Sequence, residues 1–266
     1  MSASTPGREI APEIYRDFSA RADELAGRVI AVTGAGDGIG RALALAAAAC
    51  GAQVILIGRT VRKLEAVHAQ IQSSAGGGAT IAPLDLERAL ARDYDQLAEA
   101  LQARYGRLDG LAHLAGILGT LCPIAQYDVP TWVRVLHVNL TAAFALTQVL
   151  LPLVLKAEDA SIIFTSSGVA RRPRAYWGAY AVSKAGLEAL STTLADELES
   201  AGRVRVNVLN PGPVRTRMRA QAYPAEDPAK LVTAEQVVPP FLWLLTAASR
   251  GITGRSLDCQ PLLSAR

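Results

Sequence analysis

Short apolar runs alternate with longer segments of helical periodicity along most of the chain. The apolar runs lie at residues 29–32, 53–57, 80–84, 110–114, 162–165 and 205–209, and their length and branched residues are typical of buried strands. The segments at 41–50, 61–73, 92–105 and about 179–200 have the spacing of helices. This alternation predicts an α/β fold, a doubly wound parallel sheet of about seven strands with helices on both faces, whose last strand lies within 251–260.

One uncharged apolar segment, residues 138–155, is long enough to be compared with a membrane span. It follows Pro130, which suits the first turn of a helix, and it contains Asn139, Thr147 and Pro152. Polar residues at these positions favour a helix buried inside the protein over a helix in lipid. We therefore expect no membrane association.

Composition narrows the class of protein. With 266 residues, 50% of them hydrophobic, the chain can bury a large core in a single domain. Its 27 Lys and Arg against 24 Asp and Glu form no long basic tract, which argues against a nucleic-acid partner. Cys50, Cys122 and Cys259 are scattered, and neither they nor the dispersed histidines indicate a metal site. Isolated cysteines and an N-terminus without an apolar run predict a cytoplasmic protein.

A glycine-rich turn joins the first predicted strand to the first predicted helix. Its sequence is Thr33-Gly34-Ala35-Gly36-Asp37-Gly38-Ile39-Gly40. Glycines here allow a tight turn and let a pyrophosphate approach the backbone amides at the start of the helix. An ordinary glycine turn is the alternative, but the place between strand and helix favours a dinucleotide site.

Tyr180 and Lys184 lie four residues apart in the predicted helix 179–200 and therefore on one face of it. A cation beside a phenol favours the phenolate, so we expect Lys184 to lower the pKa of Tyr180 from its ordinary value of ~10. Tyr180 could then exchange a proton with a carbonyl or an alcohol. The spacing alone is common in helices, but Ser167 adds a hydroxyl at the carboxyl end of a strand, where open α/β sheets bind ligands.

These motifs together resemble the short-chain dehydrogenase/reductase family. The glycine turn with its Gly-x-x-x-Gly-x-Gly spacing, Ser167, the Tyr180 and Lys184 pair, and the segment 210–216 follow the family's order from about residue 28 onward. Within the family, the chain is similar to the bacterial YciK-type oxidoreductases, for example over residues 177–184. The resemblance implies a Rossmann-like fold.

The resemblance implies a catalytic set of Asn139, Ser167, Tyr180 and Lys184. Ser167 would hydrogen-bond the substrate oxygen, and Tyr180 would exchange the proton. Lys184 would hold the nicotinamide ribose, and Asn139 would anchor a water that links Lys184 to solvent.

The resemblance also implies which residues bind the cofactor. Besides Tyr180 and Lys184, they come from the glycine turn, the adenosine side and the carboxamide side, and comprise Gly34, Asp37, Gly38, Ile39, Gly40, Asp85, Leu86, Ala115, Gly116, Pro211, Gly212, Val214 and Thr216.

The end of the second strand bears on the choice of cofactor. An acidic residue there would bind the 2′-hydroxyl of NAD, whereas this chain has Arg59, and an arginine can take the 2′-phosphate of NADP. We therefore expect NADP(H), with NAD(H) as the less favoured alternative. Asp37 points the other way, because relatives that prefer NADP often carry a basic residue at that place.

Two positions depart from the family pattern. His113-Leu114 stands where the family usually has two asparagines, so the amide hydrogen bonds that tie the sheet there are expected to be lost. Cys259-Gln260-Pro261 follows Asp258 in place of the usual pair of C-terminal glycines. Both changes affect local geometry and leave the catalytic set intact.

The chain divides into a weakly ordered leader at 1–24, with Tyr15, Phe18 and Leu25 docking on the body, and a dinucleotide-binding domain at 25–266. Within the domain, residues 215–232 form an irregular excursion, which the family resemblance places beside the substrate. Six arginines border that side, namely Arg171, Arg172, Arg174, Arg215, Arg217 and Arg219. They favour an anionic small-molecule substrate, unless they are simply solvated loop residues. Tyr176 and Trp177 offer an aromatic wall for an apolar substrate, or pack in the core.

The function predicted is hydride transfer between NADP(H) and a carbonyl or secondary alcohol. A 3-oxoacyl-carrier-protein reductase is the specific alternative. An NADP(H)-binding sensor or scaffold without turnover is the alternative from another class, because a sensor needs only the glycine turn. By resemblance to relatives, the chain is expected to form a homodimer or homotetramer.

Overall fold

The computed structural model describes residues 10–74 and 76–261. Its centre is a sheet of seven parallel strands, ordered β3-β2-β1-β4-β5-β6-β7. These are β1 (Val29–Thr33), β2 (Gln53–Gly58), β3 (Gly78–Pro83), β4 (Gly110–His113), β5 (Ala160–Thr165), β6 (Val204–Asn210) and β7 (Ser256–Asp258). The strand order reverses between β1 and β4, which places a topological switch point there. The predicted doubly wound, Rossmann-like single fold is confirmed.

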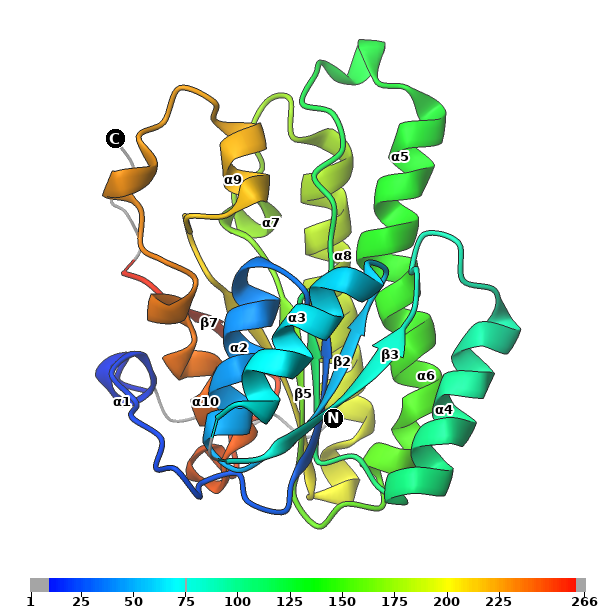
Figure 1. Ribbon diagram of the computed structural model, residues 1–266. Helices are drawn as coiled ribbons and strands as arrows, with labels where there is room; N and C mark the ends of the chain where they lie inside the picture. Colours follow the sequence, from blue (N-terminus) through cyan, green and yellow to red (C-terminus); the bar gives the residue numbers. More distant parts are fainter. Residues whose placement is uncertain (1–9, 75, 262–266) are drawn as a thin grey trace.

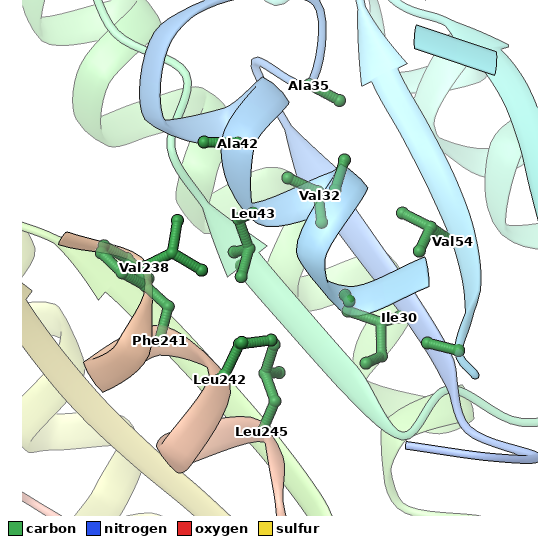
Figure 2. Packing of buried hydrophobic residues seen from close by; sticks show 14 of the residues in the cluster. Ile30, Val32, Ala35, Ala42, Leu43, Val54, Val238, Phe241, Leu242 and Leu245 are labelled. Carbon is green, nitrogen blue, oxygen red and sulfur yellow. The ribbon is translucent and has the colours of Figure 1, made fainter. Parts of the chain in front are cut away.

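Successive residues of each strand face opposite layers of helices. Ile30 and Val32 of β1 pack in one cluster, which Figure 2 shows with Phe241 and Leu242 of α10, while Val29 and Ala31 pack in the other. Because both faces of the sheet are covered, central strands such as β1 and β2 are nearly continuous apolar runs, as parallel sheets require.

Helices cover both faces of the sheet (Figure 1). The first layer holds α2 (Gly38–Ala49), α3 (Val61–Gln72) and α10 (Pro239–Leu245), and the second holds α4 (Ala91–Tyr105), α6 (Ala142–Val154) and α8 (Gly178–Glu197). Helix α10 was not predicted, because its run Pro-Pro-Phe-Leu-Trp-Leu-Leu is apolar all round and gives no periodicity. Six of its seven residues are buried.

The predicted apolar helix after Pro130 is a composite of three segments. It begins with α5 (Val129–Leu136), capped by Asp128, whose side chain accepts from the Thr131 amide at 2.8 Å. A π-helical segment, His137–Thr141, contains Asn139 and leads into α6. By length and hydropathy the helix Val129–Val154 could cross a membrane, the one such helix in the described part of the chain. Its residues Val135, Leu146 and Leu150 are fully buried, as expected of a core helix.

The N-terminal segment lies against α10. It contains α1 (Glu13–Arg16), whose Tyr15 is 4% exposed and meets Trp243 with 5.7 Å between ring centroids. Figure 1 shows α1 beside α10. Leu25 is fully buried in the same cluster, and Phe18 packs at its edge. The first nine residues of the predicted leader lie outside the described residues.

Short elements stand above the carboxyl edge of the sheet, which is the upper edge in Figure 1. Helix α7 (Gly168–Arg171) follows β5, and α9 (Arg217–Ala222) lies in the predicted excursion. A single bridge between Val214 and Val232 joins the two ends of that excursion. Residues 215–232 therefore form a flap-shaped connection at the edge where the predicted site lies.

Candidate active site

A cleft of about 1280 Å³ runs along the carboxyl edge of the sheet. Pockets for single small molecules usually have ~300–1,000 Å³, so this cleft has room for a dinucleotide and a substrate together. Its wall includes Ser167, Tyr180 and Lys184. It also includes all the other residues predicted to bind the cofactor, which are Gly34, Asp37, Gly38, Ile39, Gly40, Arg59, Asp85, Leu86, Ala115, Gly116, Pro211, Gly212, Val214 and Thr216.

The glycine turn forms one end of the cleft in the geometry that a pyrophosphate needs. Gly34 has φ +68°, a left-handed conformation that favours glycine. A β-carbon on Gly40 would lie 2.4 Å from the Gly34 carbonyl oxygen, so only glycine lets the helix approach the turn this closely. Helix α2 begins at Gly38, and its first amides therefore lie at the cleft. The turn fits a dinucleotide.

Two cations border the cleft where β2 ends. The side chain of Arg59 is 56% exposed and lies 3.5 Å from Glu87. Lys63, which the sequence analysis missed, forms an ion pair with Asp37 and also lines the cleft. A hydrogen bond from Lys63 lowers the pKa of Asp37 below its ordinary value. The signal for Lys63 was its place in the first turn of α3, four residues after Arg59.

Tyr180 and Lys184 lie one turn apart on α8, at the floor of the cleft. They are 8% and 5% exposed, and the Lys184 ammonium lies 5.7 Å from the centroid of the Tyr180 ring. Lys184 Nζ donates to the Thr165 carbonyl at 2.7 Å, and Ser167 hydrogen-bonds to the Tyr180 side chain. The three predicted residues therefore converge on one spot.

The expected lowering of the Tyr180 pKa is not found in this structure. Burial raises the pKa of Tyr180 to about 12, and the hydrogen bond from Ser167 only partly opposes this. Burial also lowers the pKa of Lys184 to about 8. The sequence prediction counted the attraction between cation and phenolate but not the loss of hydration that penalises both charged forms.

Asn139 stands behind the cleft rather than in its wall. Its amide exchanges two hydrogen bonds with the backbone of Ile117, at 2.8 and 2.9 Å, and donates to Ser183 Oγ at 3.0 Å. A β-carbon on Gly116 would lie 3.3 Å from Asn139 Oδ1 and 3.7 Å from Lys184 Nζ. Asn139 thus ties the π-helical segment to the loop after β4, close to Lys184.

The predicted loss of hydrogen bonds at His113-Leu114 is compensated. Thr33 Oγ1 accepts from the amides of Leu114 and Ala115, both at 3.0 Å. His113 Nε2 lies 2.9 Å from Thr147 Oγ1, and because that hydroxyl donates to the Ala143 carbonyl, His113 is the donor in its bond with Thr147. Burial lowers the pKa of His113 to about 3, so the ring is neutral.

Three of the six predicted substrate arginines have partners within the chain. Arg171 bonds to Glu188 at 3.2 Å and to Asp258 at 3.1 Å, and Arg219 bonds to Glu226 at 2.6 Å. Arg215 donates to the Pro228 carbonyl at 2.8 Å. These side chains stabilise the rim of the cleft. The arginines left to attract an anionic substrate are the exposed Arg172, Arg174 and Arg217.

The end of the cleft beyond Tyr180 is apolar. Tyr180 belongs to a cluster with Leu118, Val169 and Ala181, against which the partly buried Leu121, Trp177, Met218 and Ala222 pack. The Trp177 ring meets Tyr180 edge-on at 5.6 Å and Tyr223 at 5.9 Å. Trp177 therefore does both things considered from the sequence, since it lines the cleft and packs on neighbours.

The chain matches the family model described as short chain dehydrogenase over residues 28–227. The uncharacterised oxidoreductase YciK of Escherichia coli is 46% identical over 244 residues, which cover 92% of this chain and 96% of YciK. A solved short chain dehydrogenase from Pseudomonas syringae is 50% identical, with a TM-score of 0.90 over 92% of this chain and 99% of its own. A short chain dehydrogenase from Shigella flexneri, solved in complex with NADP, is 46% identical, with a TM-score of 0.86 over 91% of this chain and 100% of its own.

Proposed function

This chain belongs to the short-chain dehydrogenase family, and from that premise we propose that it transfers a hydride between NADP(H) and a carbonyl or secondary alcohol. The observation that carries the proposal is the convergence of Tyr180, Lys184 and Ser167 at the floor of a cleft whose other end is a glycine turn. A dinucleotide sensor would need the turn but not the buried Tyr180 and Lys184.

The chain's own residues divide the work of the reaction. Bound NADPH would supply the hydride, while the protein supplies orientation and proton transfer. Ser167 holds the substrate oxygen next to the Tyr180 hydroxyl. Tyr180, with its pKa raised to about 12, is protonated at neutral pH and suited to donate a proton to an oxygen that gains negative charge.

Lys184 and Asn139 would assist the proton transfer from Tyr180. Lys184 would hold the ribose hydroxyls of the cofactor and, when charged, would stabilise negative charge on Tyr180 during proton transfer. Asn139 orders the backbone at Ile117 and would anchor a water near Lys184 through which the proton is replaced.

The two cations at the end of β2 support NADP(H) over NAD(H). Arg59 and Lys63 are both partly exposed at the cleft, where they can contact a 2′-phosphate. The pairing of Lys63 with Asp37 offsets the negative charge that argued against NADP in the sequence. NADP in the Shigella flexneri relative agrees with this choice.

The acceptor is an uncharged ketone or aldehyde with an apolar group. The carbonyl would lie at Tyr180 and Ser167, and the apolar group would lie against Leu118, Trp177 and Met218. Of the six arginines near this side, Arg217 and Arg219 line the cleft, and Arg171 and Arg219 are held in ion pairs. Residues 215–232 would then form the outer wall of the acceptor site.

A cytoplasmic homo-oligomer is also part of the proposal. Cys50, Cys122 and Cys259 are unpaired, as in a reducing compartment. Val133 of α5, Phe144 of α6 and Val182 of α8 are 57%, 47% and 48% exposed, and such apolar side chains on adjoining helices suit contact with a second copy. Light scattering of the purified protein and of Phe144→Glu tests the assembly, which the variant should weaken.

The deciding experiment compares the wild type with Tyr180→Phe. NADPH oxidation is followed with a panel of apolar ketones and aldehydes, and NADPH binding is followed by fluorescence. Tyr180→Phe should lose about 10²–10⁴-fold in turnover while it still binds NADPH. Tyr105 ends α4, and its hydroxyl bonds to Thr80 away from the cleft. Tyr105→Phe makes the same chemical change there and should keep wild-type turnover. Undiminished turnover in Tyr180→Phe, or binding without any turnover in the wild type, would refute the proposal.

A further inference from the structure

The side chain of Gln260 closes the loop that follows β6. Gln260 Nε2 donates to the carbonyls of Pro211 and Pro213, at 2.6 and 2.9 Å. An amide nitrogen has two hydrogens, so these two bonds use both of them. Pro211 and Pro213 flank Gly212 and carry no N–H of their own, so their segment cannot be fixed by ordinary backbone pairing.

Gly212 fits closely against this side chain. Its φ of +71° is left-handed, and a β-carbon there would lie 2.9 Å from Gln260 Nε2. The Gly212 amide donates to Asn210 Oδ1 at 3.1 Å, and Asn210 in turn donates to Asp258 Oδ1 at 2.8 Å. The loop is therefore held by side chains from β6 and from the end of the chain.

Arg16 holds the backbone that carries Gln260. Its guanidinium donates to the carbonyl of Asp258 at 2.9 Å and to the carbonyl of Gln260 at 3.0 Å. Tyr15, next to Arg16, anchors α1 on Trp243 of α10. Arg16 thus binds the backbone of Gln260, which lies 244 residues later in the chain. Because Gln260 in turn holds the loop at Gly212, the N-terminal segment is linked to the wall of the cleft.

We propose that Gln260 is a positioning residue for the nicotinamide end of the cleft, and that Arg16 keeps Gln260 in place. This inference rests on the proposed function, because Pro211, Gly212 and Val214 line the cleft where the nicotinamide would bind. Gln260 fixes the loop before the cofactor arrives, so binding does not have to order it. Cys259-Gln260-Pro261 stands in the place where the family usually has a pair of glycines.

The test separates the two ends of the cofactor. Gln260→Met keeps the length of the side chain but removes both hydrogen-bond donors. Arg16→Met removes the hydrogen bonds that hold the backbone at Gln260. NADPH and adenosine 2′,5′-bisphosphate, which has no nicotinamide, are titrated against each full-length variant. Loss of two hydrogen bonds should weaken NADPH binding about tenfold in Gln260→Met, with a smaller loss in Arg16→Met and little change for the bisphosphate.

Controls and a second readout complete the experiment. Arg21→Met alters an exposed arginine that pairs only with Asp23 and Glu24 among the described residues, and it should bind both ligands as the wild type does. Amide exchange at Gly212 should be faster in Gln260→Met without any ligand. Equal losses for both ligands, or wild-type binding of NADPH by Gln260→Met, would overturn this inference alone. A wild type that binds neither dinucleotide would overturn the proposed function, and the inference with it.

Discussion

The ammonium of Lys184 donates a hydrogen bond to the backbone carbonyl of Thr165 across 2.7 Å. Thr165 ends β5, two residues before Ser167, and Lys184 lies on the helix that carries Tyr180. The bond thus joins the strand and the helix that supply the hydroxyls of the proposed catalytic set. It also holds a cation in a place that is 5% exposed, and this burial has measurable consequences.

Lys184→Met should make the protein more stable at pH 7 while it abolishes activity. Burial lowers the Lys184 pKa to about 8 from 10.5, so holding the charged form in the fold costs up to about 3 kcal/mol below pH 8. The cost falls as the pH rises from 8 to 10.5, because in this range the unfolded chain still binds the proton that the folded chain has lost. Urea unfolding of both proteins measures this: the difference in the free energy of unfolding between Lys184→Met and the wild type should be smaller at pH 9.5 than at pH 7. A variant less stable than the wild type at pH 7 would contradict this account.

Arg59→Met and Lys63→Met should each raise the KM for NADPH about 10- to 100-fold, because each removes a charged hydrogen bond to the 2′-phosphate. The KM for NADH should change little, since NADH has no such phosphate. Arg62→Met, next to Lys63 but absent from the cleft wall, provides the matched control. Steady-state rates with both cofactors decide the matter, and an undiminished preference for NADPH in both variants would rule out these contacts.

His113→Asn should reduce the fall in the free energy of unfolding that the wild type shows as the pH drops below 6.5. Burial lowers the His113 pKa to about 3 from 6.5, so the unfolded chain binds the extra proton first as the pH falls below 6.5. Wild-type stability then drops by about 1.4 kcal/mol per pH unit from this residue between pH 6.5 and 3, and it is fully retained above pH 6.5. Urea unfolding at pH 5 and 7 measures the slope, with His68→Asn on α3 as control. Equal slopes in the wild type and His113→Asn would show that His113 is not the cause.

Trp177→Leu should weaken binding of bulky apolar ketones more than binding of acetone. The indole forms the wall against Tyr180 and Tyr223, and its loss removes apolar contact worth about 1–2 kcal/mol, or about tenfold in kcat/KM.

Arg172→Gln combined with Arg174→Gln tests the anionic alternative. A salt-dependent rise in KM for keto acids in the double variant, with no effect of Trp177→Leu on ketones, would favour an anionic substrate.

Local patterns were enough to predict the strands and most of the helices. Mostly apolar runs of four or five residues become parallel strands because both faces of the sheet are covered, and a glycine turn between strand and helix has few possible shapes. Helix α10 escaped because Pro239–Leu245 is apolar on every side, so its sequence carries no period. In the site, Lys63 was not predicted because its pairing with Asp37 joins the first turn of α3 to the glycine turn, which are far apart in the chain.

By itself, the sequence determined the parallel α/β fold, the glycine turn and the placing of Tyr180 above Lys184, because these depend on the period of a strand or helix and on residues close in the chain. Only the tertiary structure decided that burial raises the pKa of Tyr180, that Arg171 bonds to Asp258, and that Gln260 holds the loop at Gly212. Loss of hydration and contacts between distant residues depend on how the layers pack, and no local period encodes them.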